Sequence, residues 1–262
     1  MAGLFYPNTP EALREELGRF TAARAQPMPA RGVIVPHASY RYSGSIAGET
    51  LSRVAIPRRC VILGPNHTGW GEPWSLMAEG AYVTPLGEVP IDAPFARDLL
   101  DACPLLTADD LAHRGEHAVE VGLPFLQCLG PADLTIVPLV IGSEQPDECE
   151  QLASALAGCV GRSGEPVLLV ASADFTHYEP ATVVAHQDTQ LIEAIQALDA
   201  SRFLQEVREL RVAMCGHAPI ACVLGAARRL GASGAQLVRY ATSADAGGDP
   251  QSAVGYAGII LN

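Results

Sequence analysis

The chain has 262 residues and a net charge of −12, with 48% apolar and 18% charged residues, which is typical of a globular protein and excludes a disordered one. The acidic excess and the absence of basic runs argue against nucleic acid as a partner, and no apolar run reaches the roughly 20 residues of a membrane span. The first residues, MAGLFYPNTPEAL, lack the basic start and apolar core of a signal peptide, so we expect a cytoplasmic protein.

Strand-like runs are spread along the whole chain. Several are continuous runs of Val, Ile and Leu, which indicates strands that are covered on both faces. The runs occupy residues 32–35, 60–63, 74–77, 134–141, 167–172, 236–241 and 254–261. The stretch 74–90 shows no helical pattern, and we expect a local antiparallel excursion there.

Helix-like segments alternate with these strands. Thr9 as N-cap and Pro10 as first residue predict a helix over residues 9–25. Further helical patterns cover residues 43–54, 92–103, 120–130, 147–160, 185–199, 200–210 and 218–231. The alternation predicts the α/β class, with a central, mainly parallel or mixed sheet flanked by helices. Without a repeat, a linker or a shift in composition, we expect one domain over residues 1–262.

The seven cysteines are irregularly spaced and form no CxxC pair, which argues against a disulfide framework and a zinc ribbon. Most are expected to be small buried hydrophobic residues. Cys215 differs because it stands before Gly216, where a helix is expected to begin. A thiol near a helix N-terminus has a lowered pKa and is a better ligand or nucleophile. The alternatives are a buried residue at a tight turn, or His217 as the residue of interest.

Two histidines follow predicted strands, His37 in VIVPHASY and His67 in VILGPNHTG. In open α/β sheets, ligands bind beyond the carboxyl ends of the strands. Pro36 and Pro65 stiffen the backbone before each histidine, which favours the close approach that an imidazole–metal bond requires. Neutral imidazole suits iron, zinc and copper. Taken singly, a histidine after a strand more often caps or hydrogen-bonds than binds a metal.

Two further stretches carry polar side chains beside predicted elements. In SADFTHY, Asp174 and His177 are three residues apart at a strand end, and a carboxylate that orients a histidine is the arrangement of a general base. In HRGEHAVEVGLPFLQ, Glu116 and His117 precede a helix and Glu120 follows. These acids either cap the helix through its dipole or form a wall of the site.

The motifs together resemble those of the Memo family, whose bacterial and archaeal members are called AmmeMemoRadiSam system protein B. The resemblance spans nearly the whole chain. It rests on FYP, PHASYRYSGSIAG, ILGPNHTG, EHAVEVGLPFLQ, SADFTHY, MCGHAPI and GYAGIIL, in this order. It implies a fold similar to that of the class III extradiol dioxygenases, which use non-haem iron(II).

The resemblance implies that His37, His67 and Cys215 are metal ligands. A thiolate in place of the carboxylate of the dioxygenases keeps the charge of their iron(II) ligand set, so iron(II) is the first expectation, while the softer sulfur makes zinc and copper(I) stronger alternatives. One departure concerns the residues after Cys215-Gly216. Animal members continue Arg-His-Pro, whereas this chain has His217-Ala218-Pro219, so the role of His217 stays open.

The resemblance also implies that Asp174, His177 and His117 line the same pocket, and we expect them to be its catalytic residues. His177 would be the general base or acid, and Asp174 would orient it.

Three functions fit these residues. The first is a redox enzyme acting on a small-molecule or peptide substrate. The second is a binding module that uses the same pocket without turnover, and the third is a metal-handling protein. The bacterial family name further implies an AMMECR1-like protein and a radical SAM protein as partners.

Overall fold

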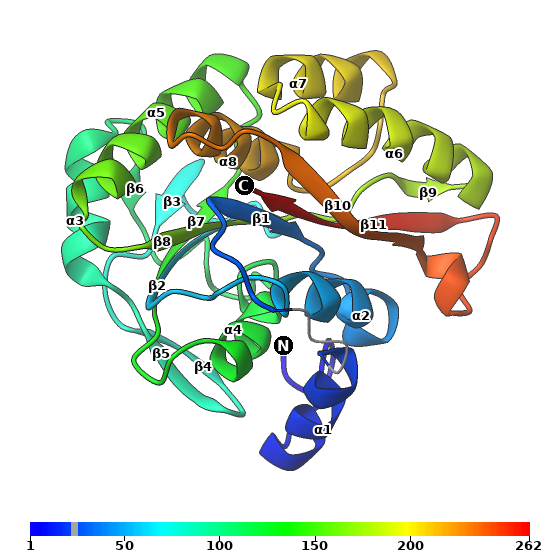
Figure 1. Cartoon of the computed structure of the whole chain (residues 1–262), viewed down its shortest axis with the longest axis horizontal. Helices are drawn as coiled ribbons and strands as arrows, with labels where there is room; N and C mark the ends of the chain where they lie inside the picture. The colour runs from blue at the N-terminus through cyan, green and yellow to red at the C-terminus, as the bar shows by residue number, and fades with distance from the viewer. Residues whose placement is uncertain (22–25) are drawn as a thin grey trace.

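The computed structural model describes residues 1–21 and 26–262 (Figure 1). Within these residues the strands are β1 (Gly32–Val35), β2 (Arg59–Pro65), β3 (Trp74–Leu76), β4 (Ala81–Thr84), β5 (Gly87–Pro90), β6 (Thr107–Ala108), β7 (Thr135–Ile141), β8 (Val167–Ser172), β9 (His177–Glu179), β10 (Ala235–Thr242) and β11 (Ala253–Leu261). Each strand predicted from an apolar run is present within one or two residues of its predicted ends.

The main sheet is ordered β10-β11-β1-β8-β2-β7-β3-β6, and β9 pairs with β11. Its centre is parallel, because β8 pairs with both β1 and β2, and β2 pairs with β7. Parallel strands end at the same edge of a sheet, so the segments that follow β1, β2 and β8 meet. This edge brings together side chains that are far apart in the sequence.

Antiparallel strands complete the sheet on both sides. On one side, β11 runs antiparallel to β1 and β10. On the other side, β3 runs antiparallel to β7, and β4 and β5 form a separate hairpin, which confirms the excursion expected over 74–90. The pattern did not predict β6 and β9, because runs of two and three residues are too short to show periodicity.

Helices cover both faces of the sheet. Their bounds are α1 (Pro10–Phe20), α2 (Tyr40–Leu51), α3 (Ala93–Ala102), α4 (Leu123–Leu129), α5 (Pro146–Arg162), α6 (Ala181–Gln196), α7 (Ala200–Glu209) and α8 (His217–Arg229). One hydrophobic core joins the sheet to α3, α5, α6, α7 and α8, and a second joins it to α1, α2 and α4. Figure 1 shows these two groups on opposite sides of the strands. The predicted α/β class, with helices flanking a central sheet, is confirmed.

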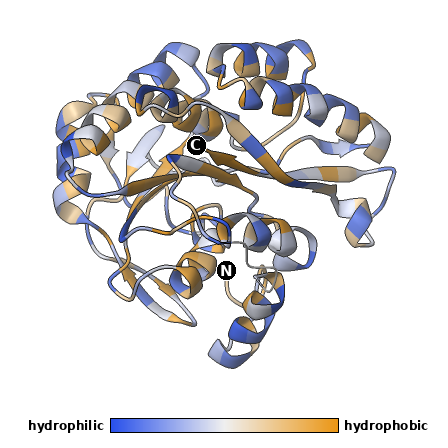
Figure 2. Ribbon diagram, viewed as in Figure 1, coloured by the Kyte–Doolittle hydropathy of each residue, from blue (hydrophilic) through white to orange (hydrophobic). Residues whose placement is uncertain are grey.

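The central strands are buried because both faces carry helices. All four residues of β1 and all six of β8 are buried, and Figure 2 shows these strands as hydrophobic between helices with hydrophilic outer faces. Helix α1 begins at Pro10 behind the Thr9 cap, whose side chain accepts from the Ala12 amide. Residues 22–25 of the predicted first helix lie outside the described residues. In the described part of the chain, we find no helix with the length and apolar character to cross a membrane.

Candidate metal centre

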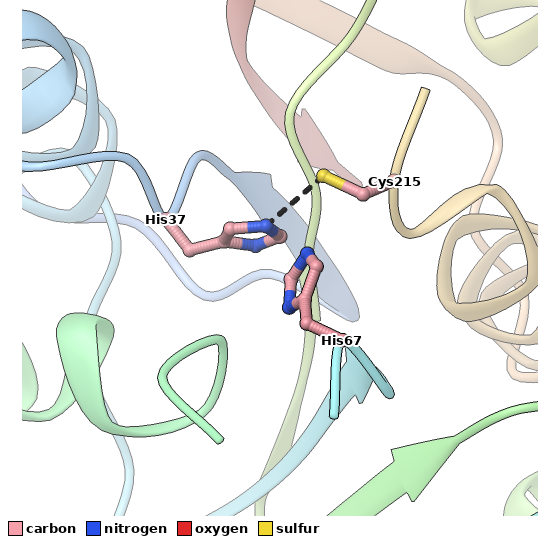
Figure 3. Close-up of side chains that lie close together, drawn as sticks. All are labelled: His37, His67 and Cys215. Carbon is pink, nitrogen blue, oxygen red and sulfur yellow. Dashed lines mark hydrogen bonds between the residues drawn. The ribbon is translucent and has the colours of Figure 1, made fainter. Parts of the chain in front are cut away.

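Three donor side chains meet at the carboxyl edge of the sheet. His37 follows β1, His67 follows β2, and Cys215 precedes α8, and one ligand atom from each lies within 4.8 Å of the others. His37 Nε2 is 3.1 Å from Cys215 Sγ. Figure 3 shows the two imidazoles and the sulfur pointing toward one another from three separate segments. The three residues that the family motifs imply as metal ligands therefore lie together.

The His37 ring is held from behind by Ser172, the last residue of β8. The Ser172 hydroxyl donates to the Ala118 carbonyl at 2.6 Å and lies 2.9 Å from His37 Nδ1. A hydroxyl has one proton, so it accepts from Nδ1–H. Nε2 then carries the free lone pair toward Cys215. Burial, followed by the nearby His67, lowers the pKa of His37 to about 3, which keeps the ring neutral.

The His67 ring is held by Glu116. Its Nδ1 lies 2.9 Å from Glu116 Oε1, and its backbone N–H donates to Glu116 Oε2. Burial alone would raise the pKa of Glu116, but hydrogen bonds from His67 and the Ala118 amide outweigh it and lower the pKa to about 2. Glu116 is therefore ionised and accepts from Nδ1–H, so the lone pair of the neutral His67 ring is on Nε2. A carboxylate behind a histidine is a common support for metal ligands.

Cys215 reaches the site because the backbone makes a tight turn at Gly216. Gly216 has φ +84°, and a Cβ there would lie 2.6 Å from the Ser172 carbonyl oxygen. Only glycine fits this approach, which pairs Cys215 with Asp174 in an isolated β-bridge. Helix α8 begins two residues after Cys215, as predicted.

The prediction that the helix N-terminus lowers the Cys215 pKa is wrong. Burial raises the pKa of the thiol, and the neighbouring Asp174 carboxylate raises it further. The desolvation of the charged form outweighs the helix dipole here. Without a metal ion the sulfur therefore keeps its proton, whereas a coordinating metal deprotonates a thiol outright.

The donor set fits a first-row metal ion. Both imidazoles present Nε2 while Nδ1 is occupied, which is the usual state of histidine ligands. Metal–nitrogen bonds of about 2.1 Å and metal–sulfur bonds of about 2.3 Å place N and S about 3.1–3.6 Å apart at angles of 90–110°. The 3.1 Å between His37 Nε2 and Cys215 Sγ agrees with this range. The side chain of His67 is 33% exposed and that of His37 is 1% exposed, so the site opens on the His67 side.

Asp174 lies against His37 instead of supporting His177. Its Oδ1 accepts from the His37 amide at 2.9 Å, and its Oδ2 is 3.9 Å from His37 Nε2. Burial raises the pKa of Asp174, although the hydrogen bond from His37 partly opposes the rise. This carboxyl therefore retains a proton to higher pH than an ordinary one.

His177 is oriented by a backbone carbonyl. Its Nδ1 donates to the Ala213 oxygen at 3.0 Å, and its Nε2 lies 3.7 Å from Cys215 Sγ. No hydrogen bond joins Asp174 to His177 within the described residues, although ligand atoms of both lie within 4.8 Å of Cys215 Sγ. The expectation that Asp174 orients His177 is therefore corrected. The proximity of both residues to the site agrees with the expectation that they line one pocket.

His117 lies in an aromatic stack beside the site. Its ring is 4.4 Å from the His67 ring and 4.5 Å from that of Phe5, nearly parallel to both. Burial, followed by the nearby His37 and His67, lowers the pKa of His117 to about 4. His117 is thus a neutral ring next to a donor residue, and its catalytic role stays a prediction.

His217 lies at the open side of the site, 3.5 Å from the Glu144 carboxylate. It lines a cleft of about 180 Å³ together with His67 and Cys215. His217 is therefore a wall residue of the site, whereas the competing donor, Cys215, occupies its centre. The other cysteines are free as well, and all of them except Cys128 are buried, as expected of small hydrophobic residues.

Sequence reasoning missed Ser172 and gave Glu116 only the roles of a helix cap or a wall. The signal for Ser172 is a hydroxyl at the end of an otherwise apolar strand. For Glu116, it is the acid directly before His117. Glu116 is 2% exposed, and its two oxygens accept from the amides of His67, His117 and Ala118. The residue anchors the loop that faces His67.

The comparisons with known proteins cover nearly the full length of this chain. The profile of the family described as Memo-like protein matches residues 1–260. A MEMO1 family protein of Methanopyrus kandleri is 37% identical, covering all of this chain and 97% of that protein. One from Methanosarcina acetivorans is 38% identical, covering all of this chain and 97% of that protein. One from Sulfolobus acidocaldarius is 39% identical, covering 87% of this chain and 81% of that protein.

A solved structure shares the fold. An uncharacterized protein of Escherichia coli K12 superposes with a TM-score of 0.57 at 17% identity, covering 88% of this chain and 99% of that one. At this identity the match concerns the architecture of the sheet and its helices alone.

Proposed function

Because the chain belongs to the Memo-like protein family, we propose that it is a metal-dependent redox enzyme whose His37, His67 and Cys215 hold a non-haem iron(II) ion. One observation carries the proposal: both imidazoles are fixed through Nδ1 and turn Nε2 toward the half-buried thiol of Cys215. Such support is expected where ring orientation matters for metal binding.

The bound ion would supply electron transfer and Lewis acidity, while the protein supplies orientation and protons. His177 has its Nδ1–H engaged by Ala213, so Nε2 is free to take a proton from a substrate at the open side. His117 is neutral at pH 7 because its pKa is about 4, and it would contribute as a neutral hydrogen-bonding ring beside the substrate. Asp174, with its raised pKa, can carry one beside His37.

The enzyme proposal is tested by anaerobic purification with elemental analysis, followed by a screen for substrate-dependent oxygen uptake. We expect iron near one equivalent per chain, and oxygen uptake with a subset of substrates. His177→Ala should abolish turnover and leave metal content intact, because a positioned base contributes about 10²–10⁴-fold to rate. His186→Ala, on an exposed face of α6, is the matched control. Loss of metal in His177→Ala would make His177 a ligand and contradict the division of roles.

The role of Cys215 has its own test. Bound as a thiolate, it should be protected from alkylation by metal and become reactive after chelation, and Cys215→Ala should lose metal. Mass spectrometry of the alkylated peptide measures this. Cys128, which is exposed, serves as the internal control because its labelling should not respond to metal. Equal labelling of Cys215 with and without metal would make it a structural cysteine.

A second candidate is a binding module that uses the site without turnover. Two exposed aromatic side chains favour it: Trp70 is 56% and Tyr178 is 74% exposed, and both follow site residues closely in the chain. Zinc or copper(I) as the purified metal, with no oxygen uptake, would favour this candidate or a metal-handling role over the enzyme.

The AMMECR1-like and radical SAM proteins remain our proposed partners, on the strength of the AmmeMemoRadiSam family name that the motif resemblance implies. Co-purification with each tagged protein tests this, and failure of both to co-purify at micromolar concentration would contradict it.

A further inference from the structure

The cleft over the metal centre is small. Its volume is about 180 Å³, whereas sites for organic ligands usually measure about 300–1,000 Å³. A substrate that reaches His67 and Cys215 through this cleft therefore extends beyond it unless it is very small.

A second cavity of about 440 Å³ continues from the first. Both are lined by Glu144, Met214 and His217, which form the junction between them. Nδ1 of His217 is buried there and has no hydrogen-bond partner in the part of the chain that the structure describes. A buried polar atom without a partner is costly, and a ligand that crosses the junction would satisfy it.

The second cavity combines an apolar wall with two arginines. The wall consists of Leu204, Val207, Val212 and Met214. The arginines are Arg208 and Arg211, and neither has a carboxylate within 4.0 Å among the described residues. The chain has 17 basic against 29 acidic side chains. Two unpaired arginines on one cavity therefore make a local basic site in a chain that is acidic overall.

Without a metal ion, the charged side chains at the two ends differ in sign. Glu116 and Asp174 flank the donor residues, and Glu144 stands at the junction. An anionic group would be attracted to the arginine end. A guanidinium also binds carboxylate or phosphate through two parallel hydrogen bonds.

We propose that the substrate is an amphipathic organic anion, which lies with its carboxylate or phosphate at Arg208 and Arg211, its apolar part along Leu204 and Val207, and its reacting end past His217 at the metal centre. The inference rests on the proposed function for the reacting end. The part of the inference that concerns the arginine end is supported by the cavity itself.

The test is calorimetric titration of the metal-loaded protein with octanoate, octyl phosphate and the neutral octanol. We expect both anions, or one of them, to bind more tightly than octanol, and the preferred anion separates a carboxylate from a phosphate substrate. The double variant Arg208→Gln/Arg211→Gln should raise the Kd of the preferred anion about 5–20-fold. Added salt should weaken binding to the wild type more than to the double variant.

Arg202→Gln is the control for the loss of positive charge, because it removes one arginine of α7 outside the cavity, where Arg202 pairs with Glu206. Thermal melting verifies that each variant is folded. Octanol binding as tightly as both anions, or an equal effect of the control, would overturn the inference.

Cys215→Ala separates this inference from the proposed function. We expect it to lose metal and to retain anion binding at the arginine end. Absence of anion binding in a protein that still holds metal would overturn only the inference, whereas anion binding in a wild-type protein that takes up no metal would overturn only the metal proposal.

Discussion

The two histidine arms of the metal centre are supported in different ways. His37 is buried and rests on a neutral hydroxyl, Ser172, inside the sheet. His67 is a third exposed and rests on an ionised carboxylate, Glu116. The carboxylate is itself buried, but three backbone amides hold it. In this site a neutral group holds the buried inner arm, and a charged group anchors the arm at the opening.

Removal of either ring should have the largest effect. His37→Ala and His67→Ala should each weaken metal binding more than about 100-fold, beyond the 10–100-fold typical of supporting residues. The folded states should respond differently. His37→Ala leaves the Ser172 hydroxyl short of a partner in the interior and should cost about 1–3 kcal/mol of unfolding free energy. His67→Ala should cost less, because Glu116 keeps its three backbone amide donors. Elemental analysis and denaturant melts measure both. Full metal occupancy in either variant would remove that residue from the ligand set.

Replacement of the two supports should have an intermediate effect. Glu116→Gln keeps the shape but removes the charge that Nδ1–H of His67 meets, so metal affinity should fall about 10–100-fold. For Ser172→Ala the loss of metal affinity should lie toward the lower end of that range, because the lost group is neutral. Anaerobic competition with a coloured chelator gives both affinities. The contrast between charged and neutral support would fail if Ser172→Ala had the larger effect.

Acid should lower the stability of the fold through His113, which lies in the loop that carries Glu116. Burial lowers the pKa of His113 from 6.5 to about 4. Between these values the unfolded chain binds a proton that the folded chain does not. The free energy of unfolding should therefore fall by up to about 1.4 kcal/mol per pH unit as the pH drops from 6.5 to 4. His113→Asn should flatten this part of the curve in urea melts, and His186→Asn, on an exposed helix face, should not. Equal curves for His113→Asn and the wild type would contradict the assignment.

The smallest expected effect belongs to the aromatic stack. Phe5→Leu removes the ring that lies on His117, and such pairs contribute about 0.5–1.5 kcal/mol. We expect a loss of that size in thermal melts and less than a tenfold change in metal affinity, since His67 keeps its contact with Glu116. A loss of metal as large as that of His67→Ala would show that the stack, and not the carboxylate, positions the exposed arm.

The sequence predicts the strands and the meeting of His37 with His67, because apolar runs and parallel strand ends are local or topological features. That Cys215 joins them is implied by the family resemblance of its motif. The sequence does not predict which side chain supports which ring. The Ser172–His37 and Glu116–His67 contacts join segments 135 and 49 residues apart, and they depend on how loops cross the edge of the sheet. The Cys215 pKa was missed for the same reason, because burial by other segments outweighs the adjacent helix.

The turn at Gly216 has a consequence for the order of events during synthesis. His37 and Cys215 are 178 residues apart in the chain, and Gly216 packs on the end of β8, which itself pairs with β1. The donor set is therefore complete only after most of the polypeptide has left the ribosome and the long-range strand pairs have formed, which is a slow class of contact. A nascent chain that ends before residue 215 contains the donors His37 and His67 but lacks the third donor, Cys215. Metal acquisition is thus expected to be a post-translational step, taken by an assembled domain.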